Sequence, residues 1–213
     1  MVLMNDKYPA EDFDHWASSY DNDVYSGGFP FLGYENTLDE IVNTTHPQSG
    51  MQILDLGVGT GNLVARFLAH GCNVTGIDFS CRMIESAKNK YPDAEYIQAD
   101  LGSDFTPLFS KRKFDRIVSA YTFHHFPLPE KCSLLKKFLP FLDDKGFFII
   151  GDIAFANLSS LNSNKERLGS FWEEEDYWLA DETIEYLSQI KLHIEFISTS
   201  LFAGVFCIKP LRK

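Results

Sequence analysis

Residues 53–62 read Ile-Leu-Asp-Leu-Gly-Val-Gly-Thr-Gly-Asn, a short apolar segment followed by glycines at alternating positions. This pattern predicts a buried strand, a tight turn and a helix that begins at Asn62. Glycines allow positive φ in the turn and let a ligand approach the backbone where a Cβ would otherwise stand. The helix would present unpaired N–H groups and a positive dipole end, which favour an anionic group. Taken alone, the stretch indicates a nucleotide-like ligand.

Asp55 narrows the choice of ligand, because it lies two residues before the first glycine of the turn, Gly57. A dinucleotide-binding turn reads Gly-x-Gly-x-x-Gly and holds a pyrophosphate group. In this chain the turn reads Asp-x-Gly-x-Gly-x-Gly instead. A fixed carboxylate beside the turn suits a ligand with positive charge, such as an ammonium or a sulfonium, better than it suits a pyrophosphate.

Two further acidic residues end predicted strands downstream. Asp78 follows the glycine turn by the roughly 20 residues expected of an acid that accepts hydrogen bonds from ribose hydroxyls. Asp100 ends a third predicted strand, where its carboxylate could accept from an exocyclic amine. In a doubly wound parallel sheet, the carboxyl ends of the strands lie at one edge, beside the ligand. The sequence therefore predicts that these acids meet Asp55 and residues 119–121 at a single site.

These elements resemble the glycine motif, the ribose-side acid and the adenine-side acid of class I S-adenosylmethionine-dependent methyltransferases. The similarity extends through Phe-Asp-His-Trp-Ala-Ser-Ser-Tyr-Asp at residues 13–21 and Phe-Asp-Arg-Ile-Val-Ser-Ala-Tyr-Thr-Phe-His-His-Phe at residues 114–126. It covers nearly the whole chain and looks especially like the small bacterial methyltransferases of the YrrT-like group. The resemblance implies S-adenosylmethionine as the cofactor and S-adenosylhomocysteine as its product, but it implies no particular substrate.

The resemblance also implies roles for individual residues around the cofactor. Gly57 and Gly59 would line the turn, with Gly57 touching the methionyl part. Asp78 would accept from the ribose hydroxyls, and Phe79 or Met83 would pack on the adenine face. The predicted cofactor-binding residues are Tyr20, Asp55, Gly57, Gly59, Asp78, Phe79, Met83, Asp100, Leu101 and Ser119.

Other implied roles concern the two ends of the cofactor. Asp100 would accept from the adenine amine, and the Leu101 N–H would face the ring. Asp55 has two open roles, because it could bind the cofactor ammonium or act indirectly by ordering the glycine loop. The Tyr20 hydroxyl is predicted to contact the cofactor carboxylate, within an N-terminal segment that closes over the methionyl end. Trp16 in that segment is equally well explained as the buried face of an amphipathic helix.

Alternating strand and helix patterns are predicted to position these residues. They indicate an α/β, Rossmann-like doubly wound fold, with helices on both faces of a mostly parallel sheet. The resemblance implies seven strands, of which periodicity supports five, and the runs 193–199 and 201–208 predict a hairpin with an antiparallel terminal strand. A single methyltransferase domain is expected over residues 1–213, with a helical cover (1–46), a cofactor-binding core (51–153), a lid or substrate region (154–190) and a terminal hairpin (191–213).

The catalytic residue stays unassigned, and His124 and Tyr121 are the candidates for a general base. A histidine after the fourth predicted strand lies where a substrate could reach, and imidazole groups suit proton transfer. The alternative for His124 and His125 is structural, with one ring bonding nearby backbone and the other packing. No acid and histidine spacing indicates a metal site, so a metal-dependent mechanism is not expected.

Residues 171–178 read Phe-Trp-Glu-Glu-Glu-Asp-Tyr-Trp and have two interpretations. The four acids at residues 173–176 could belong to a lid that selects a cationic or amine substrate. The favoured interpretation is a solvated helix face, with the aromatic residues partly packed.

Composition limits the classes of partner and the compartment. The formal net charge of −11 over 213 residues argues against a nucleic-acid partner. The motif Asn-Pro-Pro-Tyr, typical of base methylation, is absent after the fourth predicted strand. Four scattered cysteines indicate reduced thiols, and no segment approaches the roughly 18 apolar residues of a membrane span. We expect a cytoplasmic protein, monomer or homodimer, with a small-molecule substrate and no membrane partner.

The predicted function is in-line transfer of the cofactor methyl group to a small-molecule acceptor. The protein would contribute alignment and exclusion of water, because the sulfonium is already a good leaving group. A non-catalytic cofactor-binding or regulatory protein and a methyltransferase of macromolecules remain as alternatives. An NAD-dependent oxidoreductase fits less well, because it needs wider glycine spacing and gives Asp100 no role. The acceptor and its attacking atom, whether oxygen, nitrogen, sulfur or carbon, stay open.

Overall fold

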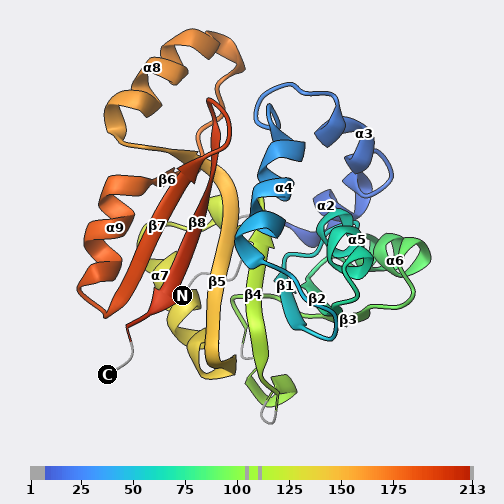
Figure 1. Ribbon diagram of the computed structural model, residues 1–213. Coiled ribbons are helices and arrows are strands. Elements are labelled where there is room, and N and C mark those ends of the chain that lie inside the picture. The colour runs from blue at the N-terminus through green and yellow to red at the C-terminus, as the bar shows by residue number, and fades with distance from the viewer. Residues whose placement is uncertain (1–7, 104–105, 110–111, 212–213) are drawn as a thin grey trace.

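A computed structural model describes residues 8–103, 106–109 and 112–211 of the chain. The first seven residues of the predicted helical cover and the last two of the predicted hairpin lie outside these ranges. The strands form one sheet in the order β3-β2-β1-β4-β5-β8-β7, with β6 paired to β5 (Figure 1). Their bounds are β1 Gln52–Leu56, β2 Asn73–Asp78, β3 Glu95–Gln98, β4 Phe114–Ala120, β5 Leu142–Phe155, β6 Trp178–Leu179, β7 Leu192–Ser198 and β8 Ala203–Pro210.

The sheet confirms the predicted doubly wound topology. Strands β1 to β5 pair in parallel, whereas β8 runs antiparallel to both β5 and β7. One difference is that the described sheet has eight strands rather than the expected seven. The additional strand is β6, which forms because the long strand β5 continues to Phe155 and leaves its end open for Trp178 and Leu179 to pair with.

Helices cover both faces of this sheet, as a doubly wound fold requires. In Figure 1, α4 and α5 lie in front of the sheet and α7 lies behind it. None of the helices in the described part of the chain has the length and apolar character of a membrane span. The α-helices are α2 Ala10–Trp16, α3 Tyr20–Tyr25, α4 Tyr34–Thr45, α5 Asn62–Ala69, α6 Cys81–Lys90, α7 Leu128–Phe138, α8 Leu158–Leu168 and α9 Ala180–Ser188.

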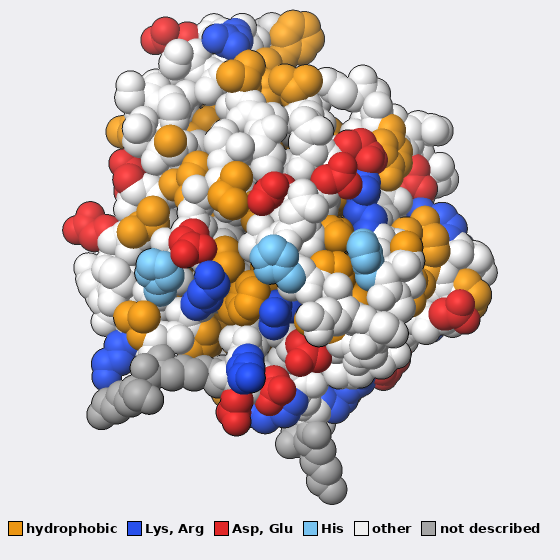
Figure 2. All heavy atoms as spheres, in the orientation of Figure 1, with side chains coloured by type: hydrophobic (Ala, Val, Ile, Leu, Met, Phe, Trp, Pro, Cys, Tyr) orange, Lys and Arg blue, Asp and Glu red, His pale blue; other side chains and the backbone are white. Residues whose placement is uncertain are grey.

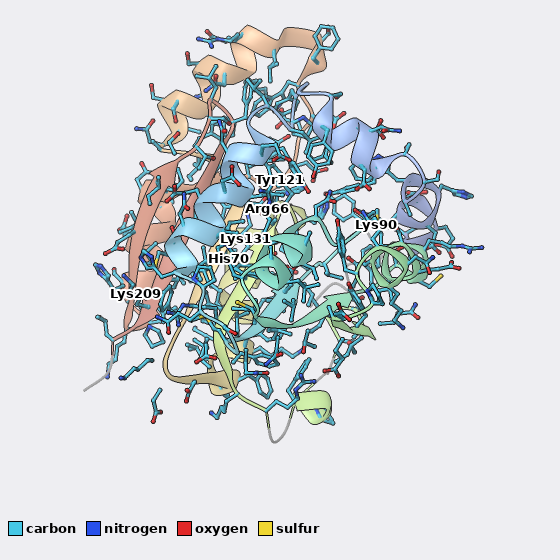
Figure 3. The ribbon with its side chains drawn as sticks, turned by 45° about the vertical axis from the view of Figure 1, so that its right-hand side comes forward. Arg66, His70, Lys90, Tyr121, Lys131 and Lys209 are labelled. Atoms are coloured by element: carbon cyan, nitrogen blue, oxygen red, sulfur yellow. The ribbon has the colours of Figure 1, made fainter. Side chains whose placement is uncertain are left out.

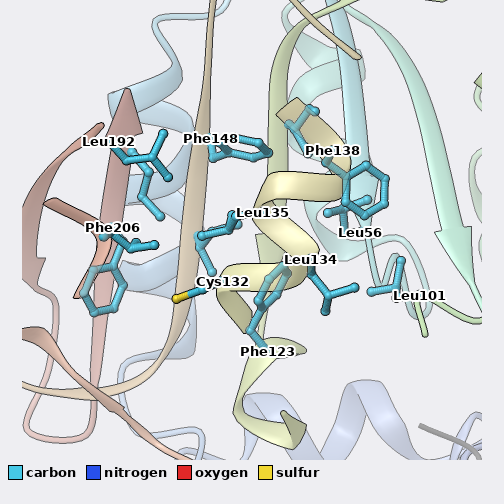
Figure 4. Packing of buried hydrophobic residues seen from close by; sticks show 14 of the residues in the cluster. Leu56, Leu101, Phe123, Cys132, Leu134, Leu135, Phe138, Phe148, Leu192 and Phe206 are labelled. Atoms are coloured by element: carbon cyan, nitrogen blue, oxygen red, sulfur yellow. The ribbon is translucent and has the colours of Figure 1, made fainter. Parts of the chain in front are cut away.

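The hydrophobic core is divided by the sheet into two clusters. Ile41 of α4 and Phe67 of α5 pack in the cluster that contains Ile149 of β5. Leu135 and Phe138 of α7 pack in the other cluster, against the opposite face of the sheet (Figure 4). Burial on both faces explains why the middle of β5 is a continuous apolar run. Packing on both faces also holds the carboxyl ends of the strands, where the site lies, in fixed positions.

Phe138→Ala tests the packing of α7 on the sheet. Phe138 is fully buried, so removing its ring should lower the free energy of unfolding by about 3–5 kcal/mol. Urea unfolding followed by circular dichroism measures the loss. Phe171→Ala is the control, because the Phe171 side chain is 78% exposed and its removal should change stability by less than about 0.5 kcal/mol. Similar losses in the two variants would contradict the burial of Phe138.

Candidate functional site

A cavity of about 370 Å³ lies at the carboxyl ends of the parallel strands. The glycine turn after β1, the ends of β2 and β4, and the segment after β3 form its floor. The N-terminal helices and residues 173–177 form the remaining walls. Seven of the predicted cofactor-binding residues line this cavity, namely Tyr20, Gly57, Gly59, Asp78, Phe79, Met83 and Leu101.

The glycine turn is tightly packed on one side and open on the other. Gly57 has a φ of 74°, and a Cβ at this position would lie 2.1 Å from the Thr122 Oγ1 atom. Gly59 has a φ of 52°, and a Cβ there would meet nothing within 4 Å. The first glycine therefore allows the turn to contact the segment after β4, while the second leaves space for a ligand beside the backbone.

Asp78 connects the end of β2 to the glycine turn. Its Oδ2 accepts a hydrogen bond from the Gly59 N–H at 2.8 Å, and its Oδ1 accepts from the Ser80 N–H at 2.9 Å. Burial raises the pKa of Asp78 to about 6, although these backbone hydrogen bonds act in the opposite direction. A carboxylate has about four acceptor positions, so Asp78 can hold the turn and still accept from a ligand in the cavity.

Asp55 lies behind the glycine turn rather than in the main cavity. It borders a second cavity of about 20 Å³, together with Tyr20, Tyr34 and Asn62. This volume is sufficient for about one water-sized group. Neither carboxyl oxygen of Asp55 has a hydrogen-bond partner among the described residues. Burial, with a smaller contribution from the charge of Asp78, raises the pKa of Asp55 to about 8.

The side chains of Asp100 and Ser119 do not line either cavity, although both were predicted to bind the cofactor. Asp100 follows β3, and its Oδ1 accepts from the Gly102 N–H at 2.7 Å. Ser119 is fully buried in β4, and its hydroxyl donates to the Leu56 carbonyl at 2.6 Å, which ties β4 to β1. Neighbouring residues, including Leu101, border the main cavity instead.

The N-terminal segment is held across the cavity by two carboxylates. Asp21 accepts hydrogen bonds from the Thr60 hydroxyl at 2.6 Å and the Lys90 ammonium at 2.8 Å. Figure 3 shows Lys90 on α6, beside the N-terminal segment. Asp14 accepts from the Ser80 hydroxyl at 2.6 Å, at the start of the same helix. These contacts hold α2 and α3 against the helices that follow β1 and β2.

His124 forms a buried pair with Asp152, which the sequence did not predict. The two side chains are joined by a hydrogen bond of 2.6 Å between the His124 Nδ1 and Asp152 Oδ1 atoms. Asp152 is fully buried and also accepts from the His124 N–H at 2.9 Å and the Trp178 indole at 3.2 Å. Because a carboxylate only accepts hydrogen bonds, Nδ1 is the donor, and in the neutral form of the ring the lone pair is therefore on Nε2. The signal in the sequence is an acid within the apolar run of β5, since buried acids are rare.

Tyr121 is less suited to act as a base. Its backbone has a φ of 52°, an uncommon conformation for a residue other than glycine and one that clusters at functional sites. Its side chain is buried beside α4 (Figure 3), and the hydroxyl donates to Thr37 Oγ1 at 3.3 Å. Burial raises the pKa of Tyr121 far above that of a free phenol. The residue lines the cavity but remains protonated, so the geometry favours His124.

Residues 172–177 have no regular secondary structure, so the prediction of a solvated helix face is wrong. Glu173, Glu175 and Tyr177 line the cavity, whereas Glu174 forms an ion pair with Lys165 of α8. This alternation is typical of an extended backbone, in which successive side chains point to opposite sides. The segment leads directly into β6, which explains why it is extended.

Comparisons with known proteins identify the family. Residues 53–146 match a family model described as a methyltransferase domain. An uncharacterized methyltransferase of Bacillus licheniformis is 36% identical over 156 residues, which cover 71% of this chain and 70% of the relative. Another, from Alkaliphilus oremlandii, is 33% identical over 186 residues, covering 84% and 83% of the two chains. A solved structure described as a DhpI–SAH complex has a TM-score of 0.73 at 17% identity and covers 96% of both chains.

The chain therefore belongs to the class I S-adenosylmethionine-dependent methyltransferases. It is an enzyme, and its cofactor is S-adenosylmethionine. The narrower resemblance to the YrrT-like group stays a prediction, because the relatives' names do not separate such groups.

Asp55→Asn tests the unpaired buried carboxyl group. Folding raises the pKa of Asp55 from 3.8 to about 8, so between these values the folded protein keeps a proton that the unfolded chain has lost. The free energy of unfolding should therefore fall as the pH rises through this range. The variant cannot ionise at this position and should lose that part of the pH dependence.

Urea unfolding of both proteins at about pH 6.5 and about pH 8.5 measures the difference, in a range above the pKa of about 6 of Asp78. Groups that titrate elsewhere affect the two proteins equally. The same loss of stability in the wild type and in Asp55→Asn would contradict the raised pKa.

Proposed function

We propose that this enzyme transfers a methyl group in-line to a small-molecule acceptor, with His124 as the general base when the acceptor must lose a proton. The observation that supports this is the arrangement of one cavity. The glycine turn and Asp78 form one end of it, and His124 and residues 173–177 border the same space. A cavity of about 370 Å³ that is largely covered by the N-terminal helices suits a small acceptor better than a macromolecule.

The residues around the glycine turn fit S-adenosylmethionine. Asp78 would accept from the ribose hydroxyls, and Phe79 would pack on the adenine ring. Tyr20 and Asp55 would face the methionyl end, where the buried Asp55 carboxyl group has no described partner. The position of a Cβ on Gly59 is open, so a ligand can approach the backbone there. When bound, this cofactor supplies a methyl group on a sulfonium sulfur.

The protein's own residues would align the acceptor and control its proton. His124 would take a proton at Nε2, while Asp152 accepts from Nδ1–H at 2.6 Å and stabilises the imidazolium that forms. Asp152 is thus a positioning residue, since it acts through His124. The N-terminal helices, held by Asp21 and Asp14, would keep water from the reacting atoms.

The charge distribution argues against nucleic acid as a binding partner. The net charge is −11, and on the face drawn in Figure 2 the Lys and Arg side chains of the described residues are interspersed with Asp and Glu. All four cysteines are free thiols, which supports a place in the reducing cytoplasm. The proposal includes a monomer or a homodimer.

Asp78→Ala tests the cofactor site by calorimetric titration. The wild type should bind S-adenosylmethionine and S-adenosylhomocysteine and should not bind NAD. The variant loses one or two hydrogen bonds to a charged acceptor, each about 1.5–3 kcal/mol, so both affinities should fall at least about tenfold. Asp93→Ala is the control, because Asp93 is exposed and outside the cavity lining. Unchanged affinity in a folded Asp78→Ala protein would place the ribose elsewhere.

His124→Gln tests the proposed base, after small thiols, amines, phenols and carboxylic acids have been screened for production of S-adenosylhomocysteine. For an amine or phenol acceptor, kcat should fall about 10²- to 10⁴-fold, with unchanged affinity for S-adenosylhomocysteine. Asp152→Asn should lower kcat in the same direction by a smaller factor. His70→Gln is the control, because His70 is exposed and outside the cavity lining. Full activity of His124→Gln on such an acceptor would exclude this base.

A further inference from the structure

One wall of the cavity carries negative charge that the cofactor does not account for. Glu173 and Glu175 line the cavity and come from a segment separate from the glycine turn. The cationic groups of the cofactor are expected near Asp55 and Tyr20 instead. None of the described residues that line the cavity is Lys or Arg. The acidic side chains of Glu173 and Glu175 therefore share this cavity with aromatic, aliphatic and imidazole groups, and no described cationic side chain offsets them there.

Tyr177 lies close to the same negatively charged glutamates. Its hydroxyl donates to the Glu173 carbonyl at 2.5 Å. Burial, and then the negative charges of Glu175 and the two preceding glutamates, raise the pKa of Tyr177. The Tyr8 hydroxyl, from the N-terminal segment, donates a hydrogen bond to Glu175. Glu175 is thus half-buried and bonded to an aromatic side chain, whereas Glu173 lines the same cavity from an exposed position.

The acidic segment is fixed beside the proposed base. The Asp176 N–H donates to the His124 carbonyl at 3.1 Å, and the Lys131 ammonium forms a hydrogen bond with the Asp176 carbonyl. Because the chain here is extended, anchoring Asp176 directs Glu175 and Glu173 into the cavity and Glu174 toward Lys165. The two carboxylates therefore border the same cavity as His124.

We propose that the methyl acceptor is an amine that binds as its ammonium cation between Glu173, Glu175 and the neighbouring aromatic rings. This proposal rests on the small-molecule function proposed above. Carboxylates and aromatic faces both attract an ammonium group, whereas the same two carboxylates would repel a carboxylate or phosphate acceptor. If the wall binds the acceptor as an ammonium, a base is required, because the nitrogen cannot attack until it loses a proton. His124 would remove that proton.

The reaction balances with the groups named. The ammonium R–NH₃⁺ gives one proton to Nε2 of His124, and Asp152 stabilises the resulting imidazolium. The nitrogen lone pair of R–NH₂ then forms the new N–C bond, while the C–S bond of the cofactor breaks and its electron pair remains on sulfur. The products are R–NH₂CH₃⁺ and S-adenosylhomocysteine, and the proton on His124 passes to solvent.

The first experiment compares acceptors that share one skeleton. 2-Phenylethylamine, benzylamine, n-butylamine and putrescine are each assayed beside the alcohol, thiol and carboxylic acid of the same carbon chain, with production of S-adenosylhomocysteine as the readout. At least one amine should be methylated at least tenfold faster than all of its counterparts. No detectable methylation of any amine, or equal or faster methylation of the counterparts, would overturn the amine proposal.

The second experiment uses the double variant Glu173→Gln/Glu175→Gln, which keeps the shape of the wall and removes its charge. KM for the best amine should rise at least tenfold, while calorimetric affinity for S-adenosylhomocysteine stays unchanged. Glu174→Gln is the matched control, because this residue pairs with Lys165 outside the cavity. Loss of S-adenosylhomocysteine affinity in the double variant would assign the acids to the cofactor and overturn the amine site.

The two proposals fail in distinguishable ways. Methylation of an alcohol, thiol or carboxylic acid but of no amine would support the small-molecule function and overturn the proposal that the acceptor is an amine. Normal binding of S-adenosylhomocysteine with methylation of no small molecule of any class would contradict both. An unchanged KM for the amine in the double variant would overturn the binding site at Glu173 and Glu175, although the acceptor would still be an amine.

Discussion

The close contact between the glycine turn and the segment after β4 is the constraint on which the rest of the site depends. The backbone of Gly57 lies so near Thr122 that a Cβ on the glycine would reach within 2.1 Å of the threonine hydroxyl oxygen. Thr122 follows Tyr121, whose backbone turns into the left-handed region, and precedes His124 by two residues. The contact therefore sets the distance between the cofactor end of the cavity and the proposed base.

Four carboxylates around this site differ in their surroundings, and the surroundings decide what each can do. Asp55 is buried without a described partner, so burial raises its pKa and the carboxyl group keeps its proton near neutral pH until a cation binds beside it. Asp152 is equally buried but accepts several hydrogen bonds, which makes it a rigid acceptor for His124. Glu173 and Glu175 lie at the more open wall, where they can bind a substrate that enters from solvent.

Local features of the site were predictable from the sequence, whereas long-range contacts were not. The strand, glycine turn and Asp78 follow from spacing and backbone requirements that act within a few residues, and the structure places them as expected. Asp152 lies 28 residues from His124, so only the pairing of β4 with β5 brings the two together. For the acidic segment, composition favours a helix, because it does not reveal that β6 begins at Trp178 and keeps the preceding chain extended.

The most direct measurement is a crystal structure of the complex with S-adenosylhomocysteine. We expect the ribose hydroxyls within hydrogen-bond distance of Asp78, the amino group beside Asp55, and the sulfur on the side of the cavity that holds His124. A ribose bound away from Asp78, or a sulfur that faces away from His124 and residues 173–177, would contradict the assignment of the two ends of the cavity.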